Sequence, residues 1–398
     1  MTTKIVVIGT GYVGLPAAVM LAHAGYEVVG VDINDNIVEA INNGVMHINE
    51  KELQDIMCHE NVKKNLKAQR QPCDANVFII AVPTPINKRK KVADMSYVKS
   101  AMESIVPYLK KGNLVILEST VPPLTCKELI KPMIEKRGLR VPEDIMVAHC
   151  PERILPGNIF NEIVNNDRII GGVDTRSGNA AKEVYSCFVK GNLYMTDDVS
   201  AELCKLMENT YRDVNIALAN EFSAVGETLG VDIKKAIALA NKHPRVNILN
   251  PGIGVGGHCI PLDPWFIKEV DPANSSLIFA SRQINEQMPA KTASKIRKAV
   301  KHIKMPEMVL LGATYKPNTD DLRESPALEV YDLLLDDGYD VKLYDPLINK
   351  YSYSSIEEIV KGVDCVAVLV EHDIVMKDIL EKENQIKELM RNPIILRF

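Results

Sequence analysis

One segment of the chain combines residues suited to covalent chemistry: Gly256-Gly257-His258-Cys259-Ile260-Pro261-Leu262-Asp263. A thiolate adds to an aldehyde to give a thiohemiacetal, and removal of a hydride from that adduct gives a thioester that water can cleave. We expect Gly256, Gly257 and His258 to form an exposed, electropositive turn, which favours the thiolate of Cys259. Asp263 could orient a lysine or activate water. The alternative is that Cys259 is a small buried residue, as most cysteines are.

A row of polar residues precedes this segment on a helix that we predict from Ala201 to about Gly230. Glu202, Lys205, Asn209 and Arg212 recur at spacings of three or four and therefore share one helix face. Lys205 could donate to an alkoxide or steer a water molecule, and Asn209 could hold that water or a sugar hydroxyl. The alternative is that the row is simply solvated. A second, apolar face is predicted from six residues, namely Leu203, Leu206, Met207, Val214, Ala217 and Leu218.

A glycine-rich sequence near the N-terminus predicts a nucleotide site. Gly9-Thr10-Gly11-Tyr12-Val13-Gly14 follows the apolar run Ile5–Ile8 and opens a helix rich in alanine and leucine. Glycines in this context allow a tight turn, and backbone N–H groups at the helix start face a pyrophosphate. Asp32 ends the second predicted strand, where a carboxylate accepts hydrogen bonds from a ribose and repels a 2′-phosphate, so NAD is expected over NADP. The alternative is a structural glycine turn.

Two later predicted strands end in hydroxyl-bearing segments, Val82–Pro85 and Glu118–Pro123. The carboxyl ends of parallel strands are where a doubly wound sheet binds ligands, so we expect Thr84 and Thr120 to face the cofactor. Hydroxyls that merely cap turns are the alternative.

The elements that must position these residues alternate between short apolar runs and helical patterns. Continuous runs at 28–31, 77–80, 114–117 and 145–148 predict a parallel sheet buried on both faces. The alternation resumes at 308–311 and continues through 327–335, 339–344 and 365–370. We predict an α/β protein with two Rossmann-like, doubly wound parallel-sheet domains, joined by a long central helix or helical domain. The expected boundaries are 1–200, 201–300 and 301–398.

The bulk composition excludes several classes of protein. A net charge of −5 over 398 residues gives no general attraction to nucleic acid or anionic membranes. No apolar run approaches the roughly 18 residues that a membrane helix needs, and the N-terminal run is expected to be a strand, not a signal peptide. The eight cysteines never form a CxxC spacing, so we expect no metal site and a reduced, cytoplasmic protein.

From Gly9 to at least Pro326, these motifs together resemble the UDP-glucose/GDP-mannose dehydrogenase family. The resemblance implies an NAD-binding domain over 1–200, a helical dimerisation domain over 201–300 and a UDP-binding domain over 301–398, in a homodimer or higher homo-oligomer. It implies oxidation of a nucleotide sugar's primary alcohol to a carboxylate with two NAD per turnover, in the synthesis of surface polysaccharide or glycan precursors. By similarity Cys259 is the nucleophile and Glu152 serves thioester hydrolysis. The other catalytic residues implied are Lys205, Asn209, Asp263 and Thr120.

Two short sequence segments indicate which nucleotide sugar the resemblance favours as substrate. The segments His149–Gly157 and His243–Asn247 resemble the members that act on UDP-N-acetylhexosamines, which favours UDP-N-acetyl-D-mannosamine. UDP-N-acetylglucosamine and UDP-glucose are alternatives, although the UDP-glucose members carry a second glutamate near the position of Pro156 that this chain lacks. By similarity the substrate would be contacted by Arg153, Lys205, Asn209, Arg212, His243, Arg245, Gly256, Tyr315, Lys316 and Arg323.

Two rival functions share part of this pattern. Single-step hydroxyacid dehydrogenases also pair an N-terminal GxGxxG with a Lys-x-x-x-Asn helix, but they need neither Cys259 nor a UDP domain. A regulator that binds NAD or a nucleotide sugar could have kept the fold and lost catalysis. Turnover with the thiol removed would favour the first rival, and binding without NADH formation would favour the second.

Overall fold

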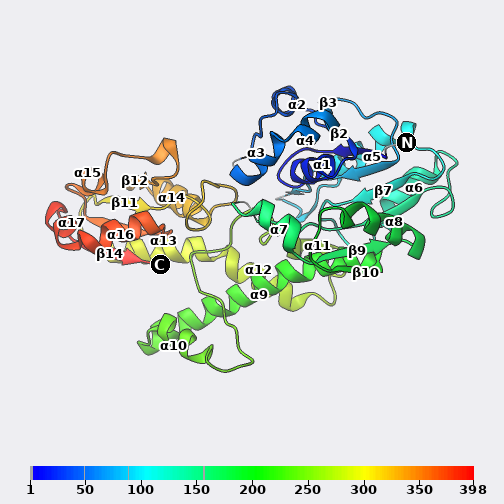
Figure 1. Ribbon diagram of the computed structural model, residues 1–398. Coiled ribbons are helices and arrows are strands. Elements are labelled where there is room, and N and C mark those ends of the chain that lie inside the picture. The colour runs from blue at the N-terminus through cyan, green and yellow to red at the C-terminus, as the bar shows by residue number, and fades with distance from the viewer. Residues whose placement is uncertain (1–2, 49, 88, 156) are drawn as a thin grey trace. The chain divides into compact units, whose positions relative to one another are not determined.

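The computed structural model describes residues 3–48, 50–87, 89–155 and 157–398 (Figure 1). Packing divides the chain into two compact units. Unit 1 comprises Met1–Glu208 with Trp265–Pro272, and unit 2 comprises Asn209–Pro264 with Ala273–Phe398. The predicted three-domain boundaries at residues 200 and 300 stay a prediction.

Unit 1 is built on an eight-stranded sheet. In sheet order its strands are β10 (Leu193–Asp197), β9 (Arg168–Gly172), β8 (Met146–His149), β7 (Leu114–Leu117), β4 (Val77–Ile80), β1 (Lys4–Ile8), β2 (Glu27–Val31) and β3 (Leu66–Gln69). Neighbouring strands are parallel except β8 and β9, which run antiparallel. The four apolar runs predicted as strands are confirmed, with bounds shifted by at most one residue, whereas β9 and β10 were not predicted.

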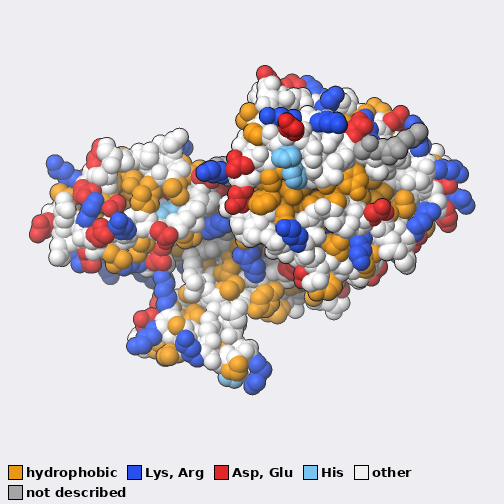
Figure 2. All heavy atoms as spheres, viewed as in Figure 1, with side chains coloured by type: hydrophobic (Ala, Val, Ile, Leu, Met, Phe, Trp, Pro, Cys, Tyr) orange, Lys and Arg blue, Asp and Glu red, His pale blue; other side chains and the backbone are white. Residues whose placement is uncertain are grey.

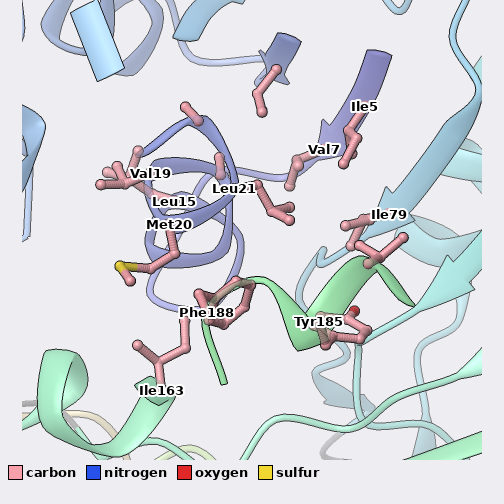
Figure 3. Close-up of a cluster of buried hydrophobic side chains, with 14 of the residues drawn as sticks. Ile5, Val7, Leu15, Val19, Met20, Leu21, Ile79, Ile163, Tyr185 and Phe188 are labelled. Carbon is pink, nitrogen blue, oxygen red and sulfur yellow. The ribbon is translucent and has the colours of Figure 1, made fainter. Parts of the chain in front are cut away.

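Alternate residues of the strands pack into two separate hydrophobic cores, so both faces of this sheet are covered. Val7 and Ile79 belong to one core, which Figure 3 shows with helix residues such as Leu15 and Tyr185. Their chain neighbours Ile8 and Ile80 belong to the core on the opposite face. The helices of unit 1 are α1 (Gly14–His23), α2 (Asp35–Asn42), α3 (Lys51–Met57), α4 (Glu60–Asn65), α5 (Ser96–Ile105), α6 (Lys131–Glu135), α7 (Ile159–Asn165) and α8 (Thr175–Ser186).

Unit 2 contains a four-stranded parallel sheet, again with a core on each face. In sheet order its strands are β12 (Asp340–Tyr344), β11 (Glu307–Leu311), β13 (Cys365–Val368) and β14 (Ile394–Arg397). The helices that follow α8 are α9 (Asp198–Leu229), α10 (Ile233–Ala240), α11 (Asp263–Val270), α12 (Ser276–Glu286), α13 (Met288–Val300), α14 (Pro326–Asp336), α15 (Ile356–Val360), α16 (Asp373–Glu381) and α17 (Glu383–Leu389). The predicted fold class of two doubly wound sheets and a long central helix is confirmed.

Helix α9 buries a different face from the one that apolarity alone predicts. Leu206 and Ala217 are buried as expected, but Met207 of the predicted apolar face is 56% exposed, and Leu203 and Leu218 also reach the surface. The polar residues Glu202, Lys205 and Asn209 are buried instead. Three of the four residues of the polar row therefore lie in the interior, which is unusual enough to point to a function, whereas Arg212 is exposed.

Candidate active site

The glycine fingerprint of unit 1 has the geometry that a bound dinucleotide requires. Gly9 has a φ of +85°, and a Cβ there would lie 2.8 Å from the carbonyl oxygen of Ala81. A Cβ at Gly14 would collide with the carbonyl of Gly9, which fixes the start of α1 against the end of β1. A Cβ at Gly11 would meet open space. Two glycines therefore serve the turn, and the third leaves the backbone open to a ligand.

The start of α1 suits an anion, because no side chain caps it and no acidic residue lies in its first turn. Tyr12 is partly exposed beside it, and Val13 is half-buried. Strands β1 and β4 are neighbours from which the chain departs in opposite directions across the sheet, which is the switch point where such folds bind ligands. These features fit NAD, which would supply the acceptor for a hydride when bound.

Asp32 lies beyond the end of β2 with its carboxylate oriented by three hydrogen bonds. One oxygen accepts from the backbone and hydroxyl of Thr10, at 3.1 and 3.0 Å, and the other accepts from the backbone of Asn34 at 3.0 Å. This arrangement ties the predicted ribose-binding carboxylate to the glycine turn.

We expect Asp32→Ala to raise the KM for NAD roughly tenfold to a hundredfold, because hydrogen bonds to a charged group are worth about 1.5–3 kcal/mol. Discrimination against NADP should weaken as well, since the repelling charge is gone. Initial rates measured against each cofactor test this. Asp35→Ala is the matched control, because Asp35 is exposed and pairs with Arg70 at the surface. An unchanged KM in Asp32→Ala would contradict the assignment.

Thr84 and Thr120 lie together beyond the carboxyl ends of β4 and β7. The hydroxyl of Thr84 donates to the backbone carbonyl of Thr120 at 2.6 Å. The two predicted cofactor segments are thus adjacent, with the Thr84 hydroxyl already used to join them.

A buried polar cluster surrounds the part of α9 that carries Lys205. The carboxylate of Glu202 accepts from the backbone of Leu124 at 2.6 Å and of Cys126 at 2.8 Å. Potential metal-binding atoms of Cys126, His149 and Glu202 lie within 4.8 Å of one another. Burial raises the pKa of Glu202 to about 7 and lowers that of His149 to about 3. Glu202 orders the segment after Thr120, and His149 is neutral beside Lys205.

Glu152, the residue assigned to thioester hydrolysis, follows β8 and is buried. One of its oxygens accepts from the backbone of Arg153 at 2.7 Å, and the other is paired with the guanidinium of Arg168. Arg168 also contacts Glu118 at 3.2 Å, and Glu118 accepts from the hydroxyl of Tyr185 at 2.6 Å. Burial raises the pKa of Glu118, although Arg168 opposes this shift.

The Cys259 loop lies in unit 2, and its glycines are required by close packing. Gly257 has a φ of +84°, and a Cβ there would lie 3.0–3.3 Å from the ring of Tyr315. A Cβ at Gly256 would lie 2.5 Å from the carbonyl oxygen of Glu324. Both glycines are buried, so the prediction of a fully exposed turn is wrong for them, whereas His258 is exposed and Cys259 is half-buried.

The backbone carbonyl of Cys259 accepts from the N–H groups of Leu262 and Asp263, at 3.0 and 2.9 Å, so the cysteine stands at the turn that begins α11. Asp263 is buried and accepts from the side-chain amide of Asn209 at 2.6 Å. Two of the predicted catalytic residues are therefore joined directly.

Tyr315 and Arg323 belong to the loop that packs against the Cys259 segment. The backbone N–H of Gly257 donates to the carbonyl of Arg323 at 2.9 Å. Burial raises the pKa of Tyr315, and its electrostatic neighbours include Cys259 and Arg212. Four residues of the sequence-derived substrate set, Gly256, Tyr315, Arg323 and Arg212, are thus grouped near the thiol within one unit.

The cationic side chains predicted to bind the substrate have several different environments. The Arg323 side chain forms a forked pair with Asp321, with nitrogen–oxygen distances of 2.6–3.1 Å. Lys316 lies over the ring of Tyr315, 5.7 Å from its centre. His243 and Arg245 lie on an exposed loop after α10. Arg153 pairs with Glu208 inside unit 1, and Pro156 of the motif His149–Gly157 lies outside the described residues.

The sequence interpretation missed the partners of Glu152. Arg168 and Tyr185 were not considered, and Glu118 was seen only as the start of a hydroxyl-bearing segment. The sequence offered one signal for Arg168. It directly precedes the apolar pair Ile169-Ile170, which is typical of the start of a buried strand.

The glycine turn and Asp32 of unit 1 define a dinucleotide-binding fold of the kind that NAD-dependent dehydrogenases use. The chain belongs to the UDP-glucose/GDP-mannose dehydrogenase family: the family's NAD binding domain matches residues 3–189, its central domain 199–287 and its UDP binding domain 309–397. The predicted family, the use of NAD and a nucleotide-sugar substrate are confirmed at this level. A hydroxyacid dehydrogenase would not account for the UDP binding domain.

Similar proteins share almost the whole chain. A UDP-N-acetyl-D-mannosamine dehydrogenase of Methanocaldococcus jannaschii is 48% identical over 397 residues, covering 99% of this chain and 91% of that protein. The structure of the corresponding Pyrococcus horikoshii enzyme is 42% identical with a TM-score of 0.93, covering 99% of this chain and 94% of its own. A UDP-N-acetyl-mannosamine dehydrogenase structure from Staphylococcus aureus is also 42% identical, with a TM-score of 0.89 and coverages of 99% and 94%.

Surface features agree with a chain without a strong general charge. Acidic and basic side chains are interspersed on the face shown in Figure 2. Among the described residues, no helix is both long and apolar enough to cross a membrane.

Proposed function

We propose that this enzyme oxidises the 6-hydroxyl of a UDP-N-acetylhexosamine, most of all UDP-N-acetyl-D-mannosamine, to the uronic acid. The observation that carries the proposal is the near full-length similarity to UDP-N-acetyl-D-mannosamine dehydrogenases. The Cys259 loop supports the two-step part of it, because an alcohol dehydrogenase that stops at the aldehyde needs no thiol. The acid would supply reactions that build surface polysaccharides or glycan precursors.

The proposed sequence keeps the aldehyde on the enzyme. The glycine turn and Asp32 would hold NAD, which would supply the hydride acceptor when bound. The alcohol carbon loses one hydride while the hydroxyl proton leaves to a base. The Cys259 thiolate adds to the aldehyde carbon, and loss of a second hydride from that adduct, for which a second NAD would be the acceptor, leaves a thioester. Glu152 takes a proton from water, the hydroxide attacks the thioester carbon, and the carbon–sulfur bond breaks to restore the thiolate. Two NAD are consumed per sugar.

The buried polar groups have separate roles in this sequence. Lys205 and Asn209 stabilise the oxyanions of the adduct and the hydrolysis step. Asp263 holds Asn209 through their 2.6 Å hydrogen bond. Substrate binding is assigned to a separate set of residues, in which the guanidinium groups suit the diphosphate. These residues are Tyr315, Lys316, Arg323, Arg212, His243, Arg245 and Arg153.

The substrate assignment is tested by NADH release with UDP-N-acetylmannosamine, UDP-N-acetylglucosamine, UDP-N-acetylgalactosamine and UDP-glucose compared side by side. We expect the highest kcat/KM with UDP-N-acetylmannosamine and two NADH per sugar. Differences of about 10–200-fold are reasonable where pocket shape distinguishes one small group. A clear preference for UDP-glucose would refute the assignment, and NADH formation with none of the four would leave a binding protein as the better explanation.

We also propose a homodimer, or a higher homo-oligomer, formed through α9. Tyr211, Leu218, Phe222, Val225 and Leu229 are exposed at helical spacing, and Figure 2 shows hydrophobic side chains at the surface where α9 and α10 lie. Such a row on one face is typical of an interface. His243 and Arg245, on their exposed loop, would reach the partner's substrate in this arrangement.

We expect Phe222→Glu to convert the assembly to monomers, because burying a carboxylate in an apolar interface is costly. Light scattering during size-exclusion chromatography measures the mass directly. Glu221→Gln, at the exposed neighbouring position, is the matched control. A wild type that is monomeric at micromolar concentration would contradict the proposed interface.

A further inference from the structure

A single antiparallel contact in the sheet of unit 1 has a chemical consequence. Strand β8 pairs with β9 through Ala148 with Gly172 and His149 with Gly171. Continuing this register past the end of β8 places Glu152 opposite Arg168, the first residue of β9. In a wholly parallel sheet, the first residue of a strand lies at the opposite edge from the carboxyl ends where ligands bind. The reversal therefore brings an arginine to Glu152.

Glu118 enters the same cluster from the neighbouring strand. Leu117, the last residue of β7, is in register with His149, and Glu118 follows it. One guanidinium nitrogen of Arg168 contacts Glu118 at 3.2 Å, and another is paired with Glu152. The side chains of Glu118, Glu152 and Arg168 are only 0%, 6% and 4% exposed. The ring of Tyr185, seen in Figure 3, lies 4.2 Å from the Arg168 guanidinium carbon.

The charges in this cluster do not balance if both carboxylates are ionised. One guanidinium would then face two carboxylates, and one negative charge would be left uncompensated away from water. Such a charge is costly, and proteins usually avoid it by retaining a proton. Two carboxylates that share one cation therefore titrate as a pair and not independently.

Hydrogen bonding indicates which carboxylate retains the proton. Both oxygens of Glu152 are engaged, one with the Arg153 backbone and the other with Arg168, which favours its ionised form. On Glu118, one oxygen accepts from both Arg168 and Tyr185, whereas the other is buried without a hydrogen-bond partner. The unpartnered oxygen of Glu118 is thus the site where a negative charge is least stabilised.

Among the described residues, the titratable groups that interact with Glu118, apart from Arg168, do not supply the missing charge. Burial raises the pKa of Tyr185 and of the Cys150 thiol well above their ordinary values, so both stay neutral. The Arg153 guanidinium is paired with Glu208. Burial likewise raises the pKa of Glu118, against the opposing attraction of Arg168.

We propose that Glu118 and Glu152 hold one proton between them around Arg168, and that Glu118 and Arg168 are positioning residues that keep Glu152 ionised for thioester hydrolysis. The inference rests on the proposed role of Glu152 as the group that takes the proton from water. Glu118 retains its own proton during that step, and Arg168 orients the carboxylate that acts.

The first test is the pH dependence of thioester hydrolysis, followed as the slow phase after the NADH burst in rapid mixing. In Glu118→Gln, the neutral amide takes the place of the protonated carboxyl beside Arg168, so the acidic limb should stay where it is in the wild type; if Glu118 were ionised instead, the limb should move to lower pH by about 1 unit. In Arg168→Met the limb should move to higher pH, and Arg168→Lys should recover part of the shift. Cys150→Ala removes a buried neutral neighbour and should leave the limb in place.

The second test needs no substrate. Because the pKa of Glu118 is raised in the folded protein, its stabilising contribution is complete below its ordinary pKa of about 4.3 and is lost as the pH rises through the folded value. The midpoint of urea unfolding should therefore fall with rising pH more in the wild type than in Glu118→Gln.

These outcomes separate the inference from the proposed reaction. In an active enzyme, an acidic limb that moves to lower pH in Glu118→Gln would overturn the proton on Glu118, an unmoved limb in Arg168→Met would overturn the positioning role of Arg168, and parallel urea profiles would overturn the shared proton. If no UDP-sugar yields NADH, the proposed reaction fails, while the unfolding comparison still decides where the proton lies. If Arg168→Met does not fold, a smaller upward shift in Arg168→Lys tests the positioning role, and Glu118→Gln still tests the proton.

Discussion

Replacement of Cys259 by serine should reduce formation of the sugar acid by roughly 10³-fold or more, since a hydroxyl is a far weaker nucleophile than a thiolate near neutral pH. The wild type should release two NADH per sugar, because the aldehyde stays bound as a thiohemiacetal through the second oxidation. The carbonyl of Cys259 accepts two backbone N–H groups at the start of α11, which fixes the thiol at the end of its turn. Serine fits this turn, so the loss would be chemical and not structural.

Acid formation and NADH should be measured separately, by chromatography of the sugar product and by absorbance. Cys187→Ser is the matched control, because Cys187 is an exposed thiol that is distant in sequence from the Cys259 loop. Two NADH per sugar from Cys259→Ser at the wild-type rate, or only one from the wild type, would contradict covalent trapping.

The buried strands and the long helix could be predicted because each is a local pattern. The run Val77–Ile80 is apolar at every position, which is what a strand covered on both faces requires, and the structure forms β4 over the same residues. The glycine turn was equally local, since its three glycines, strand and helix are consecutive in the chain. Such features depend on residues a few positions apart.

The partners of the candidate site could not be predicted in the same way. The hydrophobic periodicity of a strand does not show whether its neighbour is parallel or antiparallel. The antiparallel pairing of β9 with β8 is nevertheless what brings Arg168 to Glu152. Gly256 was expected to belong to an exposed turn with Gly257 and His258, but it is buried against Tyr315, which lies 59 positions further along the chain. Contacts of this kind are set by tertiary packing.

Helix α9 illustrates the same limit within one element. The periodicity of α9 distinguishes a polar face from an apolar face. Hydropathy does not predict which residues are buried, because Glu202, Lys205 and Asn209 are buried and Met207 is exposed. Glu202 is buried because it accepts the backbone N–H groups of Leu124 and Cys126, a need that sequence spacing cannot reveal. Met207 is exposed on the face where a partner chain is proposed.

Replacement of Glu152 by glutamine should stop the reaction at the thioester. Glutamine keeps the shape and can still accept one hydrogen bond, but it cannot take a proton from water. Both hydride transfers precede this step, so each active site should release two NADH rapidly and then turn over about 10²–10⁴-fold more slowly than the wild type. This burst distinguishes the variant from Cys259→Ser, in which the thioester never forms.

Rapid quenching followed by mass spectrometry of the intact protein should reveal the sugar attached to Cys259. Glu143→Gln, which changes an exposed carboxylate in the same unit, should hydrolyse the thioester at the wild-type rate and accumulate no more adduct than the wild type. Loss of the burst itself in Glu152→Gln would place the residue in the oxidation steps. A wild-type rate would remove it from the mechanism, and Arg168 would then pair with a purely structural carboxylate.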